Sequence, residues 1–232
     1  MKKFVIISEA RTGSNMLMSI LNSIPEIYCH AELFHPKKIF SDIFNIPYTL
    51  YQRDLSPISF LEAVEEQTCH NTNASFFGFK LFFNHNRKVM DYIISNKNYK
   101  IILITRKNSI AQYASHRRAL KSNIWSSFQG DSNNTTINFV LSEYILFKIR
   151  SFYRINLFKL KAKIHNRDYI NTKYEDLIEG NFKKIEDFFD IDKNIMNIDA
   201  STYKKQMLNQ GESYMLFSNK HYVKFLKKIF IL

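Results

Sequence analysis

The first 23 residues carry the pattern that most constrains the fold, an apolar run followed by a short loop and a helical pattern. Residues 3–8 are apolar enough to form a buried strand, and residues 9–13 form a tight loop. Residues 14–23 carry apolar side chains at helical spacing, and the pattern ends before Pro25 because the residue preceding a proline is disfavoured in a helix. A strand that leads directly into a helix is typical of a parallel sheet.

Strands and helices continue to alternate along the chain. The patterns predict helices over residues 109–120 and through Leu177 and Phe182. They predict further strands over residues 78–83, 99–105 and 169–172. We therefore expect an α/β fold in which helices cover both faces of a parallel sheet. Ligands of such sheets bind at the carboxyl ends of the strands, so the loops after the first and third predicted strands are the candidate site.

Length and composition predict one basic domain. We find no repeat and no Pro/Gly/Ser linker, so residues 1–232 are expected to form a single domain. Lys and Arg exceed Asp and Glu by 33 to 21, which gives a formal net charge of +12. This excess favours an anionic partner such as a nucleotide, a glycan, nucleic acid or a membrane surface. A generally basic surface explains it equally well.

The ends of the chain and its cysteines bear on localisation. The apolar run near the N-terminus is too short for a signal peptide or a membrane span. Cys29 and Cys69 have neither a disulfide framework nor zinc-site spacing, so we expect reduced thiols and a cytoplasmic protein. Residues 222–232 are apolar with three lysines and would allow peripheral contact with the inner membrane face. Packing of this segment against the domain is the favoured alternative, because exposure of its apolar residues would serve no purpose.

The loop after the first strand has the features of an anion cradle. Gly13 permits backbone angles closed to other residues, and Ser14 is a candidate helix N-cap. The helix N-terminus favours an anion, and Arg11 adds a guanidinium suited to phosphate or sulfate oxygens. The Walker A pattern is absent, because its second glycine and its lysine are missing. An ordinary capped helix beside a surface arginine is the alternative.

Two blocks of sequence resemble the sulfotransferases that use 3′-phosphoadenosine-5′-phosphosulfate (PAPS). The run Arg11-Thr12-Gly13-Ser14-Asn15-Met16-Leu17, followed by Ile24-Pro25-Glu26-Ile27 and His30-Ala31-Glu32-Leu33-Phe34, resembles their 5′-phosphosulfate-binding region. It is most similar to bacterial carbohydrate sulfotransferases of the trehalose and nodulation-factor type. The resemblance implies a P-loop-like parallel sheet flanked by helices, donor contacts from residues 11–16, and Glu32 as the catalytic base.

The second block, Ile104 to Ser115, resembles the 3′-phosphate motif of the same family, in which a strand ends in Arg and a Ser follows on the next helix. The resemblance implies that Arg106 and Ser115 bind the terminal phosphate. Many sulfotransferases space the two residues by eight, which would select Lys107 instead. We favour Arg106 because it ends the strand. A basic helix start on the surface is the alternative.

Weaker matches extend the resemblance over most of the chain. They are Gly78-Phe79-Lys80-Leu81, Lys173-Tyr174-Glu175-Asp176-Leu177 and Lys205-Gln206. Each match is short, but all of them occur in the order that the family shows.

The resemblance implies a mechanism in which a sulfuryl group moves in line from PAPS to an acceptor hydroxyl. Glu32 would accept the proton, and Arg11 would neutralise charge on the leaving oxygen. Lys80 and His30 are candidate contacts to the acceptor, although a structural role for His30 is as consistent with the sequence. Glu32 itself has the alternative of a solvated surface carboxylate. We expect no metal, because the seven histidines show no ligand spacing.

The resemblance predicts a carbohydrate or glycolipid acceptor, and two other functions remain open. A nucleotide-dependent kinase of the P-loop type also has an anion cradle after its first strand, although the Gly-Lys-Ser/Thr signature is missing. A non-catalytic basic protein could bind anionic glycan or nucleic acid. We do not expect nucleic acid, because no compact aromatic-basic motif is present. The polar residues 121–136 form a loop, with a lid over the site as a hypothesis.

Overall fold

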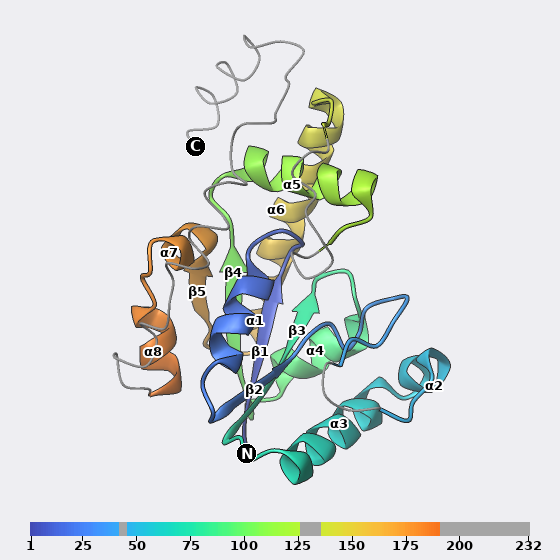
Figure 1. The fold of residues 1–232 in the computed structure, drawn as a ribbon, viewed down its shortest axis with the longest axis vertical. Helices are drawn as coiled ribbons and strands as arrows, with labels where there is room; N and C mark the ends of the chain where they lie inside the picture. Colours follow the sequence, from blue (N-terminus) through green and yellow to red (C-terminus); the bar gives the residue numbers. More distant parts are fainter. Residues whose placement is uncertain (42–45, 126–135, 191–232) are drawn as a thin grey trace.

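The computed structural model describes residues 1–41, 46–125 and 136–190, and its centre is a five-stranded sheet. The strand order is β2-β3-β1-β4-β5, and each of the four pairings is parallel (Figure 1). The strands are β1 (Lys2–Ser8), β2 (Ile27–His30), β3 (Phe76–Phe82), β4 (Tyr99–Thr105) and β5 (Ile170–Lys173). The α/β parallel sheet predicted from the sequence is confirmed.

Helices cover both faces of the sheet (Figure 1). One face packs against α3 (Pro57–Asn71), α4 (Arg87–Ser95) and the lower part of α6 (Leu141–Ile164). The other packs against α1 (Ser14–Asn22), α7 (Tyr174–Ile178) and α8 (Lys183–Phe189). Two further helices, α2 (Leu50–Leu55) and α5 (Ser109–Ser122), lie at opposite ends of the molecule. Within the described ranges, no helix combines the length and the apolar character needed to cross a bilayer.

The central strand supplies both cores by simple alternation. Val5 and Ile7 point into the cluster with α3, α4 and α6, while Phe4 and Ile6 point into the cluster with α1, α7 and α8. All four side chains are fully buried. A strand buried on both faces is apolar throughout, which is why the first run of the sequence is easily recognised.

Four of the five strands were predicted from the sequence, each to within two residues at both of its ends. The strand β2 was not predicted. The predicted helix over 14–23 ends one residue earlier, at Asn22, and α5 extends to Ser122. The predictions made for residues 126–135, Lys205-Gln206 and residues 222–232 lie outside the described part of the chain.

Gly78 in β3 leaves room for the ring of Phe4 in the neighbouring strand β1. It pairs with Phe4 across β3 and β1, and a Cβ built on Gly78 would lie 2.1 Å from the Phe4 ring. The ring therefore occupies the space that any other residue at this position would need. The Gly-Phe-Lys sequence thus has a structural reason for its glycine.

We predict that Gly78→Ala lowers the free energy of unfolding by about 1–3 kcal/mol, because the added methyl overpacks the core against Phe4. Chemical denaturation of Gly78→Ala, Phe4→Leu and the double variant forms a thermodynamic cycle. The smaller leucine should relieve part of the cost, so the double variant should be more stable than the sum of the single changes implies. Strictly additive costs would contradict the proposed contact.

Candidate functional site

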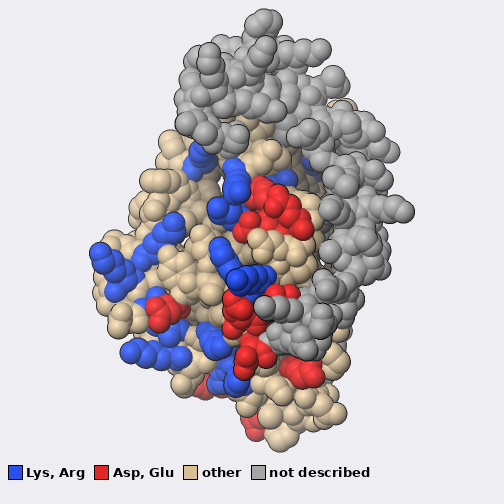
Figure 2. Space-filling model, turned by 90° about the vertical axis from the view of Figure 1, so that its left-hand side faces the viewer, with Lys and Arg blue, Asp and Glu red and all other residues tan. Residues whose placement is uncertain are grey.

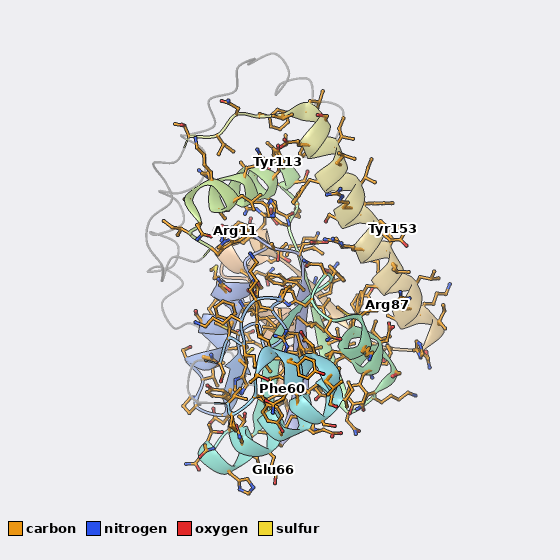
Figure 3. The ribbon with its side chains drawn as sticks, turned by 90° about the vertical axis from the view of Figure 1, so that its right-hand side faces the viewer. Arg11, Phe60, Glu66, Arg87, Tyr113 and Tyr153 are labelled. Atoms are coloured by element: carbon orange, nitrogen blue, oxygen red, sulfur yellow. The ribbon has the colours of Figure 1, made fainter. Side chains whose placement is uncertain are left out.

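The carboxyl ends of the strands bring the predicted site residues to one edge of the sheet. Arg11 follows β1, Glu32 follows β2 and Arg106 follows β4. Lys80 lies in β3 near its carboxyl end, and Tyr174 follows β5 directly. Each strand therefore contributes a side chain to the same region, and Figure 3 shows Arg11 at this end of the domain, close to α5.

The loop after β1 is held in a tight curve by its backbone. Arg11 and Gly13 both have positive φ angles, 64° and 86°. The hydroxyl of Thr12 donates to the Glu9 carbonyl at 2.9 Å, and the Gln112 side-chain amide donates to the Ala10 carbonyl at 2.9 Å. The loop is thus fixed by contacts within itself and with α5.

The N-terminus of α1 faces this loop without a side-chain cap. The N-cap is Gly13, so the expectation that Ser14 would occupy this position is wrong, and Ser14 is instead the first helical residue. A glycine is tolerated there because the left-handed backbone angles are open to it. No side chain of the described residues caps the helix, so the N–H groups of Ser14, Asn15 and Met16 belong to an uncapped first turn. Such a turn attracts an anion.

Two arginines and a serine meet on one side of the loop. The Arg11 Nε donates to the Ser115 hydroxyl at 2.8 Å, and the Arg106 guanidinium donates to the Arg11 carbonyl at 3.2 Å. The Arg106 guanidinium also lies 4.1 Å from the centre of the Tyr174 ring. Its buried Nε has no hydrogen-bond partner among the described residues, which leaves a donor for a ligand.

Lys107 lies differently from Arg106, although the two are neighbours in the sequence. Its side chain is exposed, and its backbone N–H, together with that of Asn108, donates to the Glu175 carboxylate at 3.0 and 3.1 Å. The turn after β4 therefore directs Arg106 toward the loop and Lys107 toward solvent.

Within the described part of the chain, neither Arg11 nor Arg106 forms an ion pair with a carboxylate at 4.0 Å or less. Burial lowers the pKa of Arg11, and the nearby Arg106 and Arg118 lower it further. Burial likewise lowers the pKa of Arg106, while Tyr174 and Glu175 act in the opposite direction. Both shifts mean that the charged forms are destabilised in this structure, and a bound anion would relieve that cost.

On the other side of the loop, Glu32 lies against a buried lysine. The Lys80 ammonium is 3.3 Å from the Glu32 carboxylate and donates to the Asn15 side-chain carbonyl. The Lys80 side chain is 2% exposed and the Glu32 side chain 19%. The structure thus brings three residues that the sequence singled out separately into one cluster, with the carboxylate partly open to solvent.

His85, which was not selected as a site residue from the sequence, joins this cluster. Its Nε2 is 3.6 Å from the second Glu32 oxygen, and its ring lies 5.8 Å from that of His35. Burial, assisted by the charges of His35, Lys80 and Arg53, lowers the pKa of His85 to about 3. His85 is therefore neutral near pH 7, and its contact with Glu32 is not an ion pair. Its position two residues beyond an apolar run, Phe79 to Phe83, is a signal of a strand end.

His30 has a packed environment. It lies in β2, is 1% exposed, and its ring nitrogens are 2.8 Å from the Thr68 hydroxyl and 3.4 Å from the Ser41 hydroxyl. Burial lowers its pKa to about 4. These contacts favour the structural role for His30 over contact with an acceptor.

On the face that Figure 2 shows, which carries α7 and α8, the Lys and Arg side chains of the described residues are interspersed with acidic ones. Among the residues that the structure describes, no group of three or more His, Cys, Asp or Glu side chains is arranged to hold a metal ion.

Comparison with known proteins identifies the fold. No family model and no curated protein matches the sequence. Among solved structures, mouse sulfotransferase SULT7A1 complexed with PAP is similar, with a TM-score of 0.51 and 15% identity, over 96% of this chain and 74% of that chain. The chain has the sulfotransferase fold. The fold class predicted from the sequence is confirmed, and the edge that carries Arg11, Glu32 and Arg106 is the carboxyl edge of its sheet.

We predict that the stability of the protein falls as the pH drops below about 6.5, the ordinary pKa of histidine. Unfolded chains gain protons on His30 and His85 from that pH downward, whereas the folded protein keeps them neutral until about pH 4 and 3. Each histidine should therefore reduce the free energy of unfolding by about 1.4 kcal/mol per pH unit in this window.

Denaturation curves of wild type and His30→Gln between pH 7 and pH 4 test this. The free energy of unfolding of His30→Gln should fall less steeply with decreasing pH than that of wild type, by the contribution of one histidine. His70→Gln changes an exposed residue of α3 and is the control. An unchanged slope in His30→Gln would contradict the neutral, buried state of His30.

Proposed function

We propose that this protein transfers a sulfuryl group from PAPS to a hydroxyl of a carbohydrate or glycolipid. The observation that carries the proposal is the contact of Lys80 with both Asn15 and Glu32. It places a carboxylate that can accept a proton beside the first turn of α1, where an anionic group would bind. A transfer site needs this combination, because the base must reach an acceptor hydroxyl that itself faces the group to be transferred.

The donor would lie across the loop between the two clusters. Its 5′-phosphosulfate fits the uncapped N-terminus of α1, with residues 11–16 around it. Its 3′-phosphate fits Arg106 and Ser115, where the Arg106 Nε has no partner among the described residues. PAP is the ligand named with the similar mouse structure, which supports a nucleotide of this kind.

The reaction would be an in-line displacement at sulfur. The acceptor oxygen forms a bond to sulfur while the bond between sulfur and the bridging oxygen of the donor breaks, and PAP leaves. Glu32 takes the acceptor proton, and Arg11 neutralises charge on the bridging oxygen. Lys80 supplies a second positive charge near Asn15, so it would serve the transferred group as well as Glu32. The carbohydrate or glycolipid acceptor rests on the sequence resemblance.

A transfer assay tests the proposal. Sulfur-labelled PAPS is incubated with the protein and a panel of disaccharides, polysaccharides and lipid-linked sugars, and label in the acceptor is measured. We predict that Glu32→Gln lowers the transfer rate by roughly 10²–10⁴-fold, the usual contribution of a general base. Its affinity for PAP, measured by calorimetry, should stay within about threefold, because Glu32 does not belong to the cation cluster that would bind the nucleotide.

The unchanged affinity also shows that the variant is folded. Transfer by Glu32→Gln at the wild-type rate would exclude Glu32 as the base. Transfer of phosphate from ATP in the presence of Mg²⁺, with none from PAPS, would contradict sulfuryl transfer and favour the kinase. Binding that depends on salt alone, without any transfer, would favour a non-catalytic basic protein.

A further inference from the structure

Helix α6 exposes an apolar stripe to solvent. Eight of the 14 large apolar side chains that are exposed among the described residues lie on this one helix. Six of them recur every three or four residues, so they share one face of the helix. They are Leu146, Ile149, Tyr153, Leu157, Leu160 and Ile164. The stripe runs along most of a helix about 36 Å long, and a patch of this length marks an interaction surface.

The stripe lies opposite the side of α6 that packs against the protein. The buried residues Tyr144, Phe158 and Ala162 face the domain. Figure 3 shows Tyr153 on the outer side of the helix, turned away from the sheet. Ile149, Leu160 and Ile164 are 57, 55 and 69% exposed, so they contribute little to the buried core.

Basic residues flank the stripe on both sides. At 100° per residue, Arg150 and Lys161 lie along one border, and Lys159 and Lys163 lie along the other. Lys161 is paired with Asp91 of α4, so Arg150 is the charge of the first border that is open to a partner. The helix has six Lys or Arg residues and one acidic residue, Glu143, which pairs with Arg117 at 2.9 Å. An apolar face between two basic borders is the pattern of a helix that lies in the interface of a membrane.

We propose that α6 binds the surface of an anionic lipid bilayer through this stripe. The basic residues beside the stripe favour a lipid surface over a second copy of the chain and over the C-terminal segment. A second copy of the chain would bring basic borders against basic borders, and residues 222–232, which carry three lysines, would meet the same repulsion. Anionic headgroups instead pair with both borders while the apolar side chains enter the acyl boundary. The proposal stands independently of the sulfuryl-transfer reaction.

Helix α6 also borders the candidate site. A pocket beside the loop after β1 is lined by Glu9, Thr12 and Arg106 and, from α6, by Phe147 and Ser151. The buried Glu9 carboxylate pairs with Arg154 of α6 at 3.2 Å, which fixes the helix to this loop. Only the width of α6 would therefore separate a bilayer bound to its outer face from the candidate site.

Sedimentation with vesicles tests the proposal. The full chain is mixed with vesicles of phosphatidylcholine alone or with about one third phosphatidylglycerol, and the bound fraction is measured at low and high salt. We expect binding to the anionic vesicles that weakens with salt. The triple variant Ile149→Gln, Leu160→Gln, Ile164→Gln should reduce the partition coefficient at least about tenfold, because it removes apolar side chains from the bound face.

Two other variants are controls. Tyr51→Gln with Leu55→Gln removes exposed apolar side chains from α2, and it should bind vesicles as wild type does. Phe225→Gln with Ile229→Gln changes the apolar C-terminal sequence, and it should also bind. An unaltered melting temperature and circular dichroism spectrum of the triple variant show that it is folded.

Several outcomes would overturn the proposal. They are absence of vesicle binding by wild type, equal binding to neutral vesicles, and loss of binding in the C-terminal variant but not in the α6 variant. A wild-type dimer in light scattering that the triple variant converts to a monomer, without vesicle binding, would assign the stripe to a second copy instead.

Discussion

Lys80 lies near the carboxyl end of β3 and its side chain is buried, so its ammonium group would be strongly destabilising without a partner. The side chain finds its partners on two other elements, Asn15 in the first turn of α1 and Glu32 after β2. Because the charge must be paired, these three segments are held in one arrangement. The same pairing places a carboxylate beside the N-terminus of a helix, and the proposed chemistry depends on that placement.

A second constraint acts on the opposite side of the loop. The Tyr174 ring lies against Gly13, where a Cβ would come within 2.5 Å of it, and it also lies under the Arg106 guanidinium. One aromatic ring therefore sets both the curve of the loop after β1 and the position of the arginine after β4. The positive φ of Gly13 adds to this requirement, since a side chain would be strained there as well as in contact with the ring.

The strands and helices that the sequence predicts are those with a clear local pattern of apolar residues. The apolar runs of β1 and β4 are long and buried on both faces, so their bounds are clear from hydropathy alone. Strand β2 has four residues, too few to show a period, and its burial depends on pairing with β3. Helix α6 carries apolar residues on two opposite faces, one buried against the domain and one exposed, and this hides the single apolar periodicity that would identify the helix from its sequence.

Some site residues could likewise be predicted from local patterns, whereas others depend on contacts that only the folded chain makes. Arg11 and Arg106 were selected from motifs that follow predicted strands, whereas Glu32 follows β2, which was not predicted, and was selected through the resemblance alone. The choice between Arg106 and Lys107 needs the course of the backbone after β4, and a spacing along the chain does not contain it. His85 was not selected because its contact with Glu32 joins residues 53 positions apart, and only the folded sheet brings them together. Ser14 has the chemistry of an N-cap, but the left-handed turn at Gly13 moves the start of the helix by one residue.

The central proposal is that Arg106 and Ser115 bind the 3′-phosphate of a nucleotide, and calorimetry with PAP and with AMP tests it most directly. The account predicts that wild type binds PAP more tightly than AMP by roughly 10–100-fold, the contribution of charge-assisted hydrogen bonds to one phosphate. Arg106→Ala should lose this preference, and the matched variant Lys107→Ala should keep it because its side chain points to solvent. Equal affinity of wild type for PAP and AMP, or a preference that survives in Arg106→Ala, would contradict the account.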